Sequence, residues 1–424
     1  MSLPRPWFFI AFGCLVTVAA LRAAVTGPMT QAIVLAPQTG TEREDVEIRR
    51  WQARAREGNA DAAGFERLGW AFVAKARRTL DAGYYALAEK TAEVMKQRFG
   101  ASPGEQLLRG HVLNNLHRFA EAEKVARELV RVRGETADYA LLSDALMEQG
   151  ELGAAIEACQ QLVNLKPGVE AYSRIAHLRW LKGDLAGATA MMEAAEHAVS
   201  PRDAETRAWL LARLSGYYLQ AGQTPRALLV AESALNAAAS YPPALLARGR
   251  ALLALGKSSD AAAVLQRAAE LNPLPEYQWW LADTLRAAGD NVAADKIELV
   301  IRKRGEAADP RTLALFLATR GEAATEAVRL ARAELETRAD VLTHDALAWA
   351  LAASGELSPA QTEIDLALAE HTRDARLLWH AGEIALLRGE RAAAGKLFSE
   401  AQPFAATLTP GERAGLDQRL ARAQ

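Results

Sequence analysis

The sequence has little cysteine, no excess of either charge and no hydrophobic run long enough to span a bilayer comfortably. Only two of its 424 residues are cysteines, Cys14 and Cys159. Neither a disulfide framework nor a paired-cysteine metal motif is therefore available. The net charge is only −2, because 50 Lys and Arg nearly balance 52 Asp and Glu. Nucleic acid is not expected as the main ligand, since duplex binding needs a clustered basic face.

Motifs that carry catalysis are also missing. The chain has no phosphate-binding Gly-x-x-x-x-Gly-Lys-Ser/Thr loop, no Gly-x-Ser-x-Gly nucleophile turn and no His-Glu-x-x-His helix. His380 with Glu383, and His344 with Asp345, could each supply two metal ligands, but neither pair has a third ligand at helical spacing. We therefore expect no catalytic residues, no metal and no cofactor, and predict that the protein is not an enzyme.

What the sequence does have is a glycine that recurs at nearly constant spacing. One interval, from Gly183 to Gly222, is longer than the others, and His117 takes the same place one interval before the first glycine. An alanine follows seven of the eight glycines by five residues; the exception is Gly321, where Ala327 comes one position late. A period of roughly 34 residues indicates a stacked array of helix pairs. The glycines are Gly150, Gly183, Gly222, Gly256, Gly289, Gly321, Gly355 and Gly389.

The segment 380–401 shows why this spacing suits a helix pair. A first amphipathic helix ends at Gly389, because glycine adopts the left-handed conformation of a helix end at little cost. A second helix then begins, and Ala394 is expected where the two helices cross and a large side chain would force them apart. Phe398 and Ala401 continue the same apolar face at helical spacing.

These repeats resemble tetratricopeptide (TPR) repeats over roughly residues 61 to 404. The segment 310–338 is a degenerate repeat. The segment Ala76–Glu89 looks like the enlarged first hairpin of a group of exported or membrane-anchored bacterial TPR proteins of unassigned function. The segments Asp345–Leu351 and His380–Gly382 look like that group as well. One repeat fills nearly every slot of the family pattern, with Leu245, Gly249, Leu252, Gly256, Ala261, Leu265, Ala268 and Pro273.

The resemblance implies an all-α fold, a TPR α-solenoid. In such a fold about ten antiparallel helix pairs form a right-handed superhelix between two capping helices. We expect a linker over 25–41, an N-terminal capping helix over 42–60, the array over 61–404 and a C-terminal capping helix over 405–424. The final helix is expected to begin at a capping box in Thr409-Pro410-Gly411-Glu412.

The first 24 residues are predicted to direct export. Arg5 precedes an uninterrupted apolar run, Trp7 to Leu21, which is the layout of a secretory signal peptide. Three interpretations stay open, a cleaved signal, an uncleaved membrane anchor and a buried cytosolic helix. The first two place the repeats outside the cytoplasm, because a basic residue before the run keeps the N-terminus inside. We expect a periplasmic protein or one anchored to the inner membrane.

A ligand is expected in the concave groove, because the first helix of each repeat lines that face in a TPR superhelix. Seven of the nine tryptophans lie on first helices, either packed against the next helix or facing the groove as anchors. Adjacent first helices lack the basic set that holds a partner's C-terminal carboxylate. By register, the groove residues are Trp70, His111, Asn114, Asn115, Asp144, Glu148, His177, Trp180, Arg250, Trp279, Asp283, Arg286, Asp345, Trp349, Trp379 and Glu383.

These features favour a non-catalytic scaffold that holds a partner protein or peptide in the groove. Because the groove mixes acidic residues with tryptophan, a basic and apolar partner segment is expected. One alternative is a solenoid that binds a small ligand such as a glycan or cell-wall fragment. A less favoured alternative is the regulatory part of an envelope enzyme or transport complex. Attachment to a membrane through the N-terminus is compatible with each of them.

Overall fold

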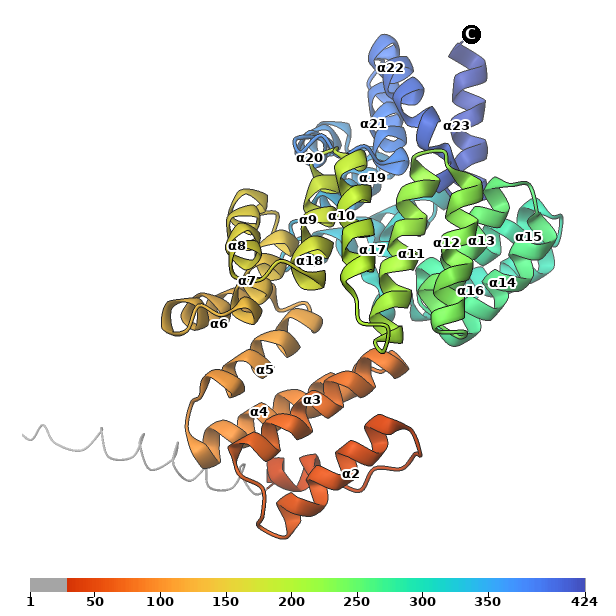
Figure 1. Cartoon of the computed structure of the whole chain (residues 1–424). Coiled ribbons are helices and arrows are strands. Elements are labelled where there is room, and N and C mark those ends of the chain that lie inside the picture. Colours follow the sequence, from red (N-terminus) through yellow and green to blue (C-terminus); the bar gives the residue numbers. More distant parts are fainter. Residues whose placement is uncertain (1–28, 424) are drawn as a thin grey trace, which may run out of the picture. The chain divides into compact units, whose positions relative to one another are not determined.

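The computed structural model describes residues 29–423, and every regular element in that range is a helix (Figure 1). The predicted all-α fold is therefore confirmed. The chain divides into two compact units, residues 1–141 and 142–424, which are described separately below. The predicted signal or anchor over residues 1–24 lies outside the described residues.

Unit 1 is built on a capping helix followed by helix pairs. Residues 29–34 are helical as well, where the sequence predicted a linker, and Val34 is fully buried against the unit's core. A buried ion pair between Lys75 and Asp45 joins α3 to α2. The helices are α2 (Arg43–Arg56), α3 (Ala62–Thr79), α4 (Gly83–Phe99), α5 (Pro103–Asn115), α6 (Phe119–Val132) and α7 (Thr136–Glu148), the last of which contains the division between the units.

Unit 2 continues with helix pairs and ends in a 3-10 helix and one final helix. Together with α3 to α7, the helices α8 to α22 make ten pairs, which agrees with the number that the resemblance implied. They are α8 (Leu152–Leu165), α9 (Val169–Leu181), α10 (Leu185–Ala198), α11 (Ala204–Gln220), α12 (Thr224–Ala237), α13 (Pro242–Ala254), α14 (Ser258–Leu271), α15 (Pro275–Ala287), α16 (Asn291–Ala308), α17 (Pro310–Arg320), α18 (Ala324–Leu335), α19 (Val341–Ala353), α20 (Leu357–Leu368), α21 (Ala375–Leu387), α22 (Arg391–Ala401), η1 (Gln402–Thr407) and α23 (Pro410–Ala423).

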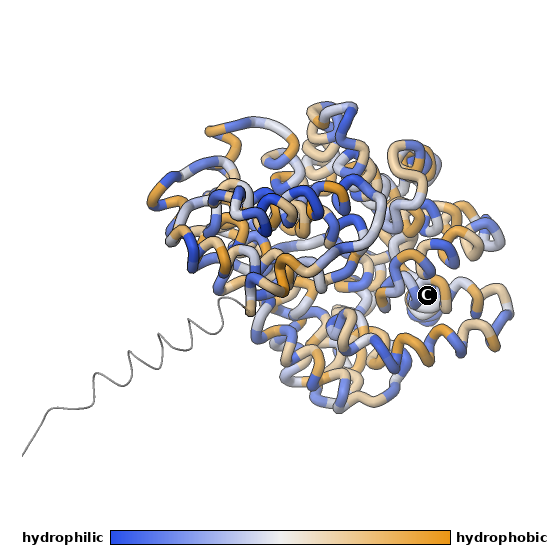
Figure 2. Tube along the Cα trace, turned by 90° about the horizontal axis from the view of Figure 1, so that it is seen from below, coloured by the Kyte–Doolittle hydropathy of each residue, from blue (hydrophilic) through white to orange (hydrophobic). Residues whose placement is uncertain are grey.

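The repeat glycines adopt the left-handed conformation, and the repeat alanines are buried, as their spacing predicted. All eight glycines have φ between +65° and +88°, and His117 adopts the same left-handed conformation at φ +57°. The alanines five residues later, and Ala327, are at most 1% exposed. Short stretches of hydrophobic and hydrophilic residues alternate along the helices, as the packing of amphipathic pairs requires (Figure 2). Within residues 29–423, no helix has the length and apolar character needed to cross a membrane.

Helix pairs late in unit 2 contact helix pairs that come earlier in the same unit. Thr372 Oγ1 donates to the carbonyl oxygen of Leu181 at 2.5 Å, and Arg338 forms an ion pair with Glu148. Gly150 and Gly183 lie at these contacts. A Cβ added to Gly183 would overlap the carbonyl oxygen of His371, and one added to Gly150 would overlap that of Ala339. The other six repeat glycines have open space at that position.

The final helix begins as the sequence predicted. Glu412 accepts a hydrogen bond from the backbone N–H of Thr409 at 2.9 Å, and Thr409 Oγ1 accepts one from the N–H of Glu412 at 3.3 Å. This is a capping box, with Pro410 as the first helical residue. Both Thr409 and Glu412 are buried, because α23 packs against α15 and α22.

Candidate functional site

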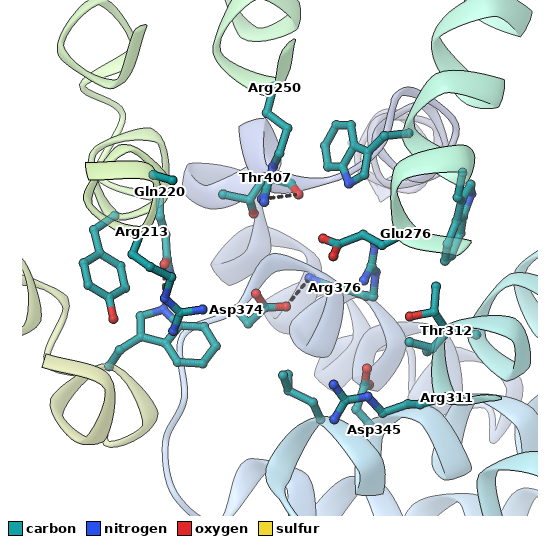
Figure 3. Close-up of a pocket in the computed structure, with 18 of the residues that line it drawn as sticks. Arg213, Gln220, Arg250, Glu276, Arg311, Thr312, Asp345, Asp374, Arg376 and Thr407 are labelled. Carbon is teal, nitrogen blue, oxygen red and sulfur yellow. Dashed lines mark hydrogen bonds between the residues drawn. The ribbon is translucent and has the colours of Figure 1, made fainter. Parts of the chain in front are cut away.

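A polar cavity of about 410 Å³ lies among the first helices of unit 2. Side chains from α9, α11, α13, α15, α17, α19 and α21 line it, together with a residue of η1. Its lining is rich in charge of both signs (Figure 3). The charged residues are Arg213, Arg250, Arg311, Arg376, Glu276, Asp309, Asp345 and Asp374.

Two of the four arginines are paired with the chain's own carboxylates. Arg376 binds both oxygens of Glu412, at 2.6 and 3.0 Å, and Arg311 binds both oxygens of Asp340, at 3.2 and 3.0 Å. Burial alone would raise the pKa of Glu412, but the charge of Arg376 and its hydrogen bonds hold that pKa below its usual value. We call this part of the cavity, on α17 and α21, the paired side.

The other two arginines have no such partner. Among residues 29–423, no carboxylate lies within ion-pair distance of Arg250 or Arg213. Arg250 donates to the carbonyl oxygen of Thr407 at 3.3 Å and its guanidinium lies 4.9 Å from the ring centroid of Trp280. Burial lowers the pKa of Arg250, whereas those of Arg311 and Arg376 are raised by their partners despite burial. We call this part, on α11 and α13, the unpaired side.

Arg213 is held in place by a neutral histidine. Its Nη2 lies 3.0 Å from His177 Nδ1, and burial together with the Arg213 charge lowers the pKa of His177 to about 3. The imidazole is therefore uncharged at neutral pH, and Nδ1 accepts a hydrogen bond from the guanidinium. The His177 ring is stacked on Trp180 at 5.6 Å with an interplanar angle of 9°. Trp180 Nε1 in turn donates to Gln220 Oε1 at 2.8 Å.

The aromatic part of the lining contains buried donors without partners. Tyr217 is 5% exposed and Trp279 is 1% exposed. The hydroxyl of Tyr217 and the indole N–H of Trp279 have no hydrogen-bond partner within the described residues. Buried polar groups are nearly always paired, so these two mark the cavity wall as a place where a ligand group or water completes the bonding.

The chain's own C-terminal segment covers part of the groove predicted for a ligand. Asp283 accepts hydrogen bonds from Thr409 Oγ1 at 2.6 Å and from the Gly411 N–H at 3.2 Å, and it also pairs with Arg320. Helix η1 contacts α11 and α13, and α23 contacts α15. The open part of the groove is thus the cavity bounded by this segment.

The structure brings five of the predicted groove residues together in the cavity lining. These five are His177, Trp180, Arg250, Trp279 and Asp345. The remaining predicted residues of unit 2 lie outside it, bonded to the chain itself or buried. Asp144 pairs with Arg174, Glu148 with Arg338, Arg286 with Asp295 and Glu298, Glu383 with Arg419, and Asp283 with the C-terminal segment; Trp349 is stacked on His380, and Trp379 is 6% exposed.

The four predicted residues of unit 1 lie near one another on neighbouring first helices. Trp70 on α3 and His111 on α5 have ring centroids 5.2 Å apart, and Asn115 Nδ2 donates to the carbonyl oxygen of His111 at 2.8 Å. Asn114 Oδ1 is buried without a hydrogen-bond partner. Their role as ligand residues stays a prediction.

Several cavity residues were not among the predicted ones. Helix α11 has 17 residues, against 13 in α9 and α13, and it lies in the one long glycine interval, from Gly183 to Gly222. A fixed register therefore misplaces the inward face of α11. Asp309 and Asp374 cap the first turns of α17 and α21 with their side chains, a signal that local sequence reading could have found. The missed polar residues are Arg213, Tyr217, Gln220, Glu276, Asp309, Arg311, Thr312, Asp374, Arg376 and Thr407.

The histidine pairs considered as metal ligands have other surroundings. His380 is fully buried and its Nδ1 lies 2.9 Å from Asp345 Oδ1, while His344 Nδ1 lies 2.7 Å from Glu363 Oε2. Within residues 29–423, no group of three or more His, Cys, Asp or Glu side chains is placed to hold a metal ion.

Two segments, residues 107–170 and 246–308, match the family model described as Tetratricopeptide repeat. These two segments carry TPR repeats. Proteins of this family are generally interaction scaffolds without catalytic activity. A search of curated proteins gave no significant match.

Several solved structures resemble this TPR protein at low identity. The human IFIT1 dimer with m7Gppp-AAAA is 13% identical over 91% of this chain and 94% of its own, with a TM-score of 0.49. Yeast Tom70 is 13% identical over 96% of both chains, with a TM-score of 0.37. A tetratricopeptide repeat protein from Parabacteroides merdae is 20% identical over 60% of this chain and 98% of its own, with a TM-score of 0.34.

Proposed function

We propose that this TPR protein is a non-catalytic binding scaffold that holds a segment of a partner protein or peptide in the cavity of unit 2. The observation that carries the proposal is the unpaired side, where Arg213 and Arg250 line the cavity and neither forms an ion pair with a carboxylate of the described residues. Leaving a half-buried cation such as Arg250 uncompensated costs free energy, so sequences usually pair such groups within the fold. Arg213 is exposed and can be solvated, so Arg250 is the cation that a ligand would compensate.

The closing contacts of unit 2 support a preformed site. The cavity wall is fixed from behind by the His177–Trp180–Gln220 chain, and Gln220 Nε2 also donates to the carbonyl oxygen of Arg373. Because these lining side chains are already fixed by contacts with two parts of the unit, they lose little conformational entropy when a ligand binds.

A site-specific crosslinking experiment tests this function. A photoreactive amino acid is placed at Ala212, Thr312 or Leu342 in the cavity lining, and at the exposed positions Leu229 and Leu366 on second helices as controls. We expect one protein to be crosslinked from the cavity positions and not from the controls, identified by mass spectrometry. Equal crosslinking from both sets of positions would place the partner elsewhere on the surface and overturn the proposal.

A small ligand is the second candidate, favoured by the size of the cavity. About 410 Å³ is within the range of roughly 300–1,000 Å³ typical of small-molecule sites. Trp180, which is half-buried at the cavity, could stack on a sugar ring, while the charged lining would bind its polar groups. Native mass spectrometry of the purified protein separates the two candidates, because a retained glycan or cell-wall fragment adds a discrete mass that a crosslinked protein does not.

We also propose that the repeats work outside the cytoplasm, exported into the periplasm or tethered to the inner membrane. The support is Arg5 followed by the apolar run from Trp7 to Leu21. An alkaline phosphatase fusion after residue 60 is expected to be active, because the enzyme folds only after export. An inactive fusion with normal expression would contradict this location.

A further inference from the structure

We propose that residues 402–423, the C-terminal segment formed by η1 and α23, are an exchangeable internal ligand of the concave face of unit 2. A helix supplied by a partner takes the same place once this segment has left. The inference rests on the proposed function only for that partner, because the exchange of the segment itself can be measured without it.

The C-terminal segment contacts positions at which the sequence predicted a ligand. Arg250 on α13 donates to the carbonyl oxygen of Thr407 at 3.3 Å (Figure 3). Asp283 on α15 accepts hydrogen bonds from the Thr409 hydroxyl at 2.6 Å and from the Gly411 N–H at 3.2 Å. A helix that only capped the last repeat would contact α21 and α22. These bonds to α13 and α15 instead place the segment across the groove of earlier repeats.

Helix α21, the first helix of the last repeat, contributes two more of the predicted groove residues. Glu383 accepts hydrogen bonds from Arg419 at both carboxylate oxygens, at 2.6 and 2.8 Å. A Cβ added to Gly415 would lie 3.2 Å from Trp379 Cζ2, so glycine permits this close approach. Asp283 and Glu383 are among the groove acids for which the sequence predicted a basic partner segment. Both are bonded to donors of the chain itself, as they would be to such a partner.

Polar contacts hold the segment in the groove, with little apolar burial behind them. Over residues 402–422, the buried apolar side chains are Ala405, Leu408 and Leu416. Helix α21 alone, with 13 residues, buries seven apolar side chains. Because apolar burial supplies most of the free energy that keeps a helix in place, the C-terminal segment should leave the groove more readily than α21 unfolds.

The same contacts state what the groove requires of any occupant. Asp283 needs a donor at the first turn of a helix, and Glu383 needs a cation further along it. Arg419 lies seven residues after Glu412, a spacing that places both side chains on one face of α23. An amphipathic helix with a basic residue about two turns after its start meets both requirements. The partner segment that displaces residues 402–423 is therefore a helix of this kind.

The test measures whether the segment, added as a peptide, exchanges with the segment in the chain. The probe is a fluorescein-labelled synthetic peptide of residues 402–424, and fluorescence anisotropy follows its binding to the purified full-length protein. The peptide binds only molecules whose own segment is open, so its apparent Kd falls as the open fraction rises. Glu412→Ala protein lacks the buried ion pair with Arg376. We expect it to bind the unaltered peptide at least about a hundredfold more tightly than the wild-type protein does.

Variants of the same helix provide the controls. Asp417→Ala removes an exposed acid of α23 and should leave the Kd within about twofold of the wild-type value. Arg419→Ala removes the ion pair with Glu383 and should lower the Kd by an intermediate factor, which keeps the test decisive if Glu412→Ala does not fold. A peptide that itself carries Glu412→Ala should bind at least about tenfold more weakly than the unaltered peptide. If neither the Glu412→Ala nor the Arg419→Ala protein binds the peptide better than wild type, the segment is a fixed part of the fold and the proposal is overturned.

Crosslinking separates this inference from the proposed function. With the photoreactive amino acid at Thr312, we expect the yield of crosslinked partner to increase in the Glu412→Ala background, because the concave face beside the cavity is then open. An unchanged or smaller yield, with peptide exchange observed, would show that the partner does not take the place of the segment and would overturn the inference. Peptide exchange without a crosslinked partner in either background would support the internal ligand and reject the proposed function.

Discussion

The paired and unpaired sides of the cavity place the same residue type in opposite situations. On the paired side, Arg376 and Arg311 form ion pairs with carboxylates of the chain, and these ion pairs join neighbouring helix pairs. On the unpaired side, Arg213 and Arg250 are held only by neutral groups. Arginine lining a cavity is therefore not by itself evidence of a ligand. The difference that points to a ligand is the absence of an ion pair between these arginines and any carboxylate of the described residues, and it can be tested as a difference in stability.

The largest expected effect is on the paired side. Glu412→Ala would leave Arg376 without its partner and remove the capping box of α23. Removing one member of a buried pair costs about 3–5 kcal/mol. Because repeats contact mainly their neighbours, the loss should appear as local opening of residues 402–423, measured by hydrogen exchange.

A surface pair provides the control for Glu412→Ala. Lys396 and Glu400 lie 3.8 Å apart on α22 and are largely exposed, so Glu400→Ala should change protection by less than about 0.5 kcal/mol. Similar protection in the two variants would mean that the paired side does not fasten the C-terminal segment.

The stability of the C-terminal segment should depend on pH through the same carboxylate, Glu412. The pKa of Glu412 is lower in the folded protein than in the unfolded chain, where it is about 4.3. The stability that this carboxylate contributes is therefore fully present above about pH 4.3 and is lost as the pH falls through its folded pKa. Glu412→Gln should flatten the decline in protection of α23 below that pH. An unchanged acid profile would mean that another carboxylate carries this dependence.

The next largest effect on stability is expected where helix pairs far apart in the sequence of unit 2 meet. Gly183→Ala and Gly256→Ala impose a similar backbone cost, since both glycines have φ +75°. Only the first also pushes a Cβ into the carbonyl oxygen of His371. Overpacking of this kind costs about 1–3 kcal/mol, so Gly183→Ala should lower the thermal midpoint more than Gly256→Ala does. Equal midpoints would show that the turns separate freely, and that the cavity wall is not held from behind.

The fold could be predicted because its signals are local and repeated. Gly389 and Ala394 sit five residues apart, and each acts within its own helix pair. His117 shows the strength of the register, since it takes the left-handed conformation that glycine takes elsewhere, although that conformation costs a non-glycine residue about 1–2 kcal/mol. The register marks nine of the ten pairs, eight by glycine and one by His117.

The arrangement of the cavity could not be predicted in the same way. Whether an arginine of the cavity forms an ion pair depends on contacts between residues far apart in sequence. Glu148 looked like a free groove carboxylate, but its partner Arg338 is 190 residues away and has no periodic relation to it. Arg213 was overlooked because α11 is a turn longer than its neighbours. The predicted groove residues that line the cavity, such as Trp180, lie on helices of regular length.

The smallest effect is expected on the unpaired side, and it decides the comparison. Arg250→Gln removes a cation that has no carboxylate partner among the described residues and whose pKa is lowered by burial. Only a long hydrogen bond to Thr407 and the contact with Trp280 are lost, while the cost of burying an uncompensated charge is relieved. The stability of the ligand-free protein should therefore change by less than about 1 kcal/mol in either direction. Chemical denaturation followed by circular dichroism measures this, with Arg376→Gln as the matched variant that should lose much more. If Arg250→Gln proves as destabilising as Arg376→Gln, then Arg250 is a structural residue and is not available to bind a ligand.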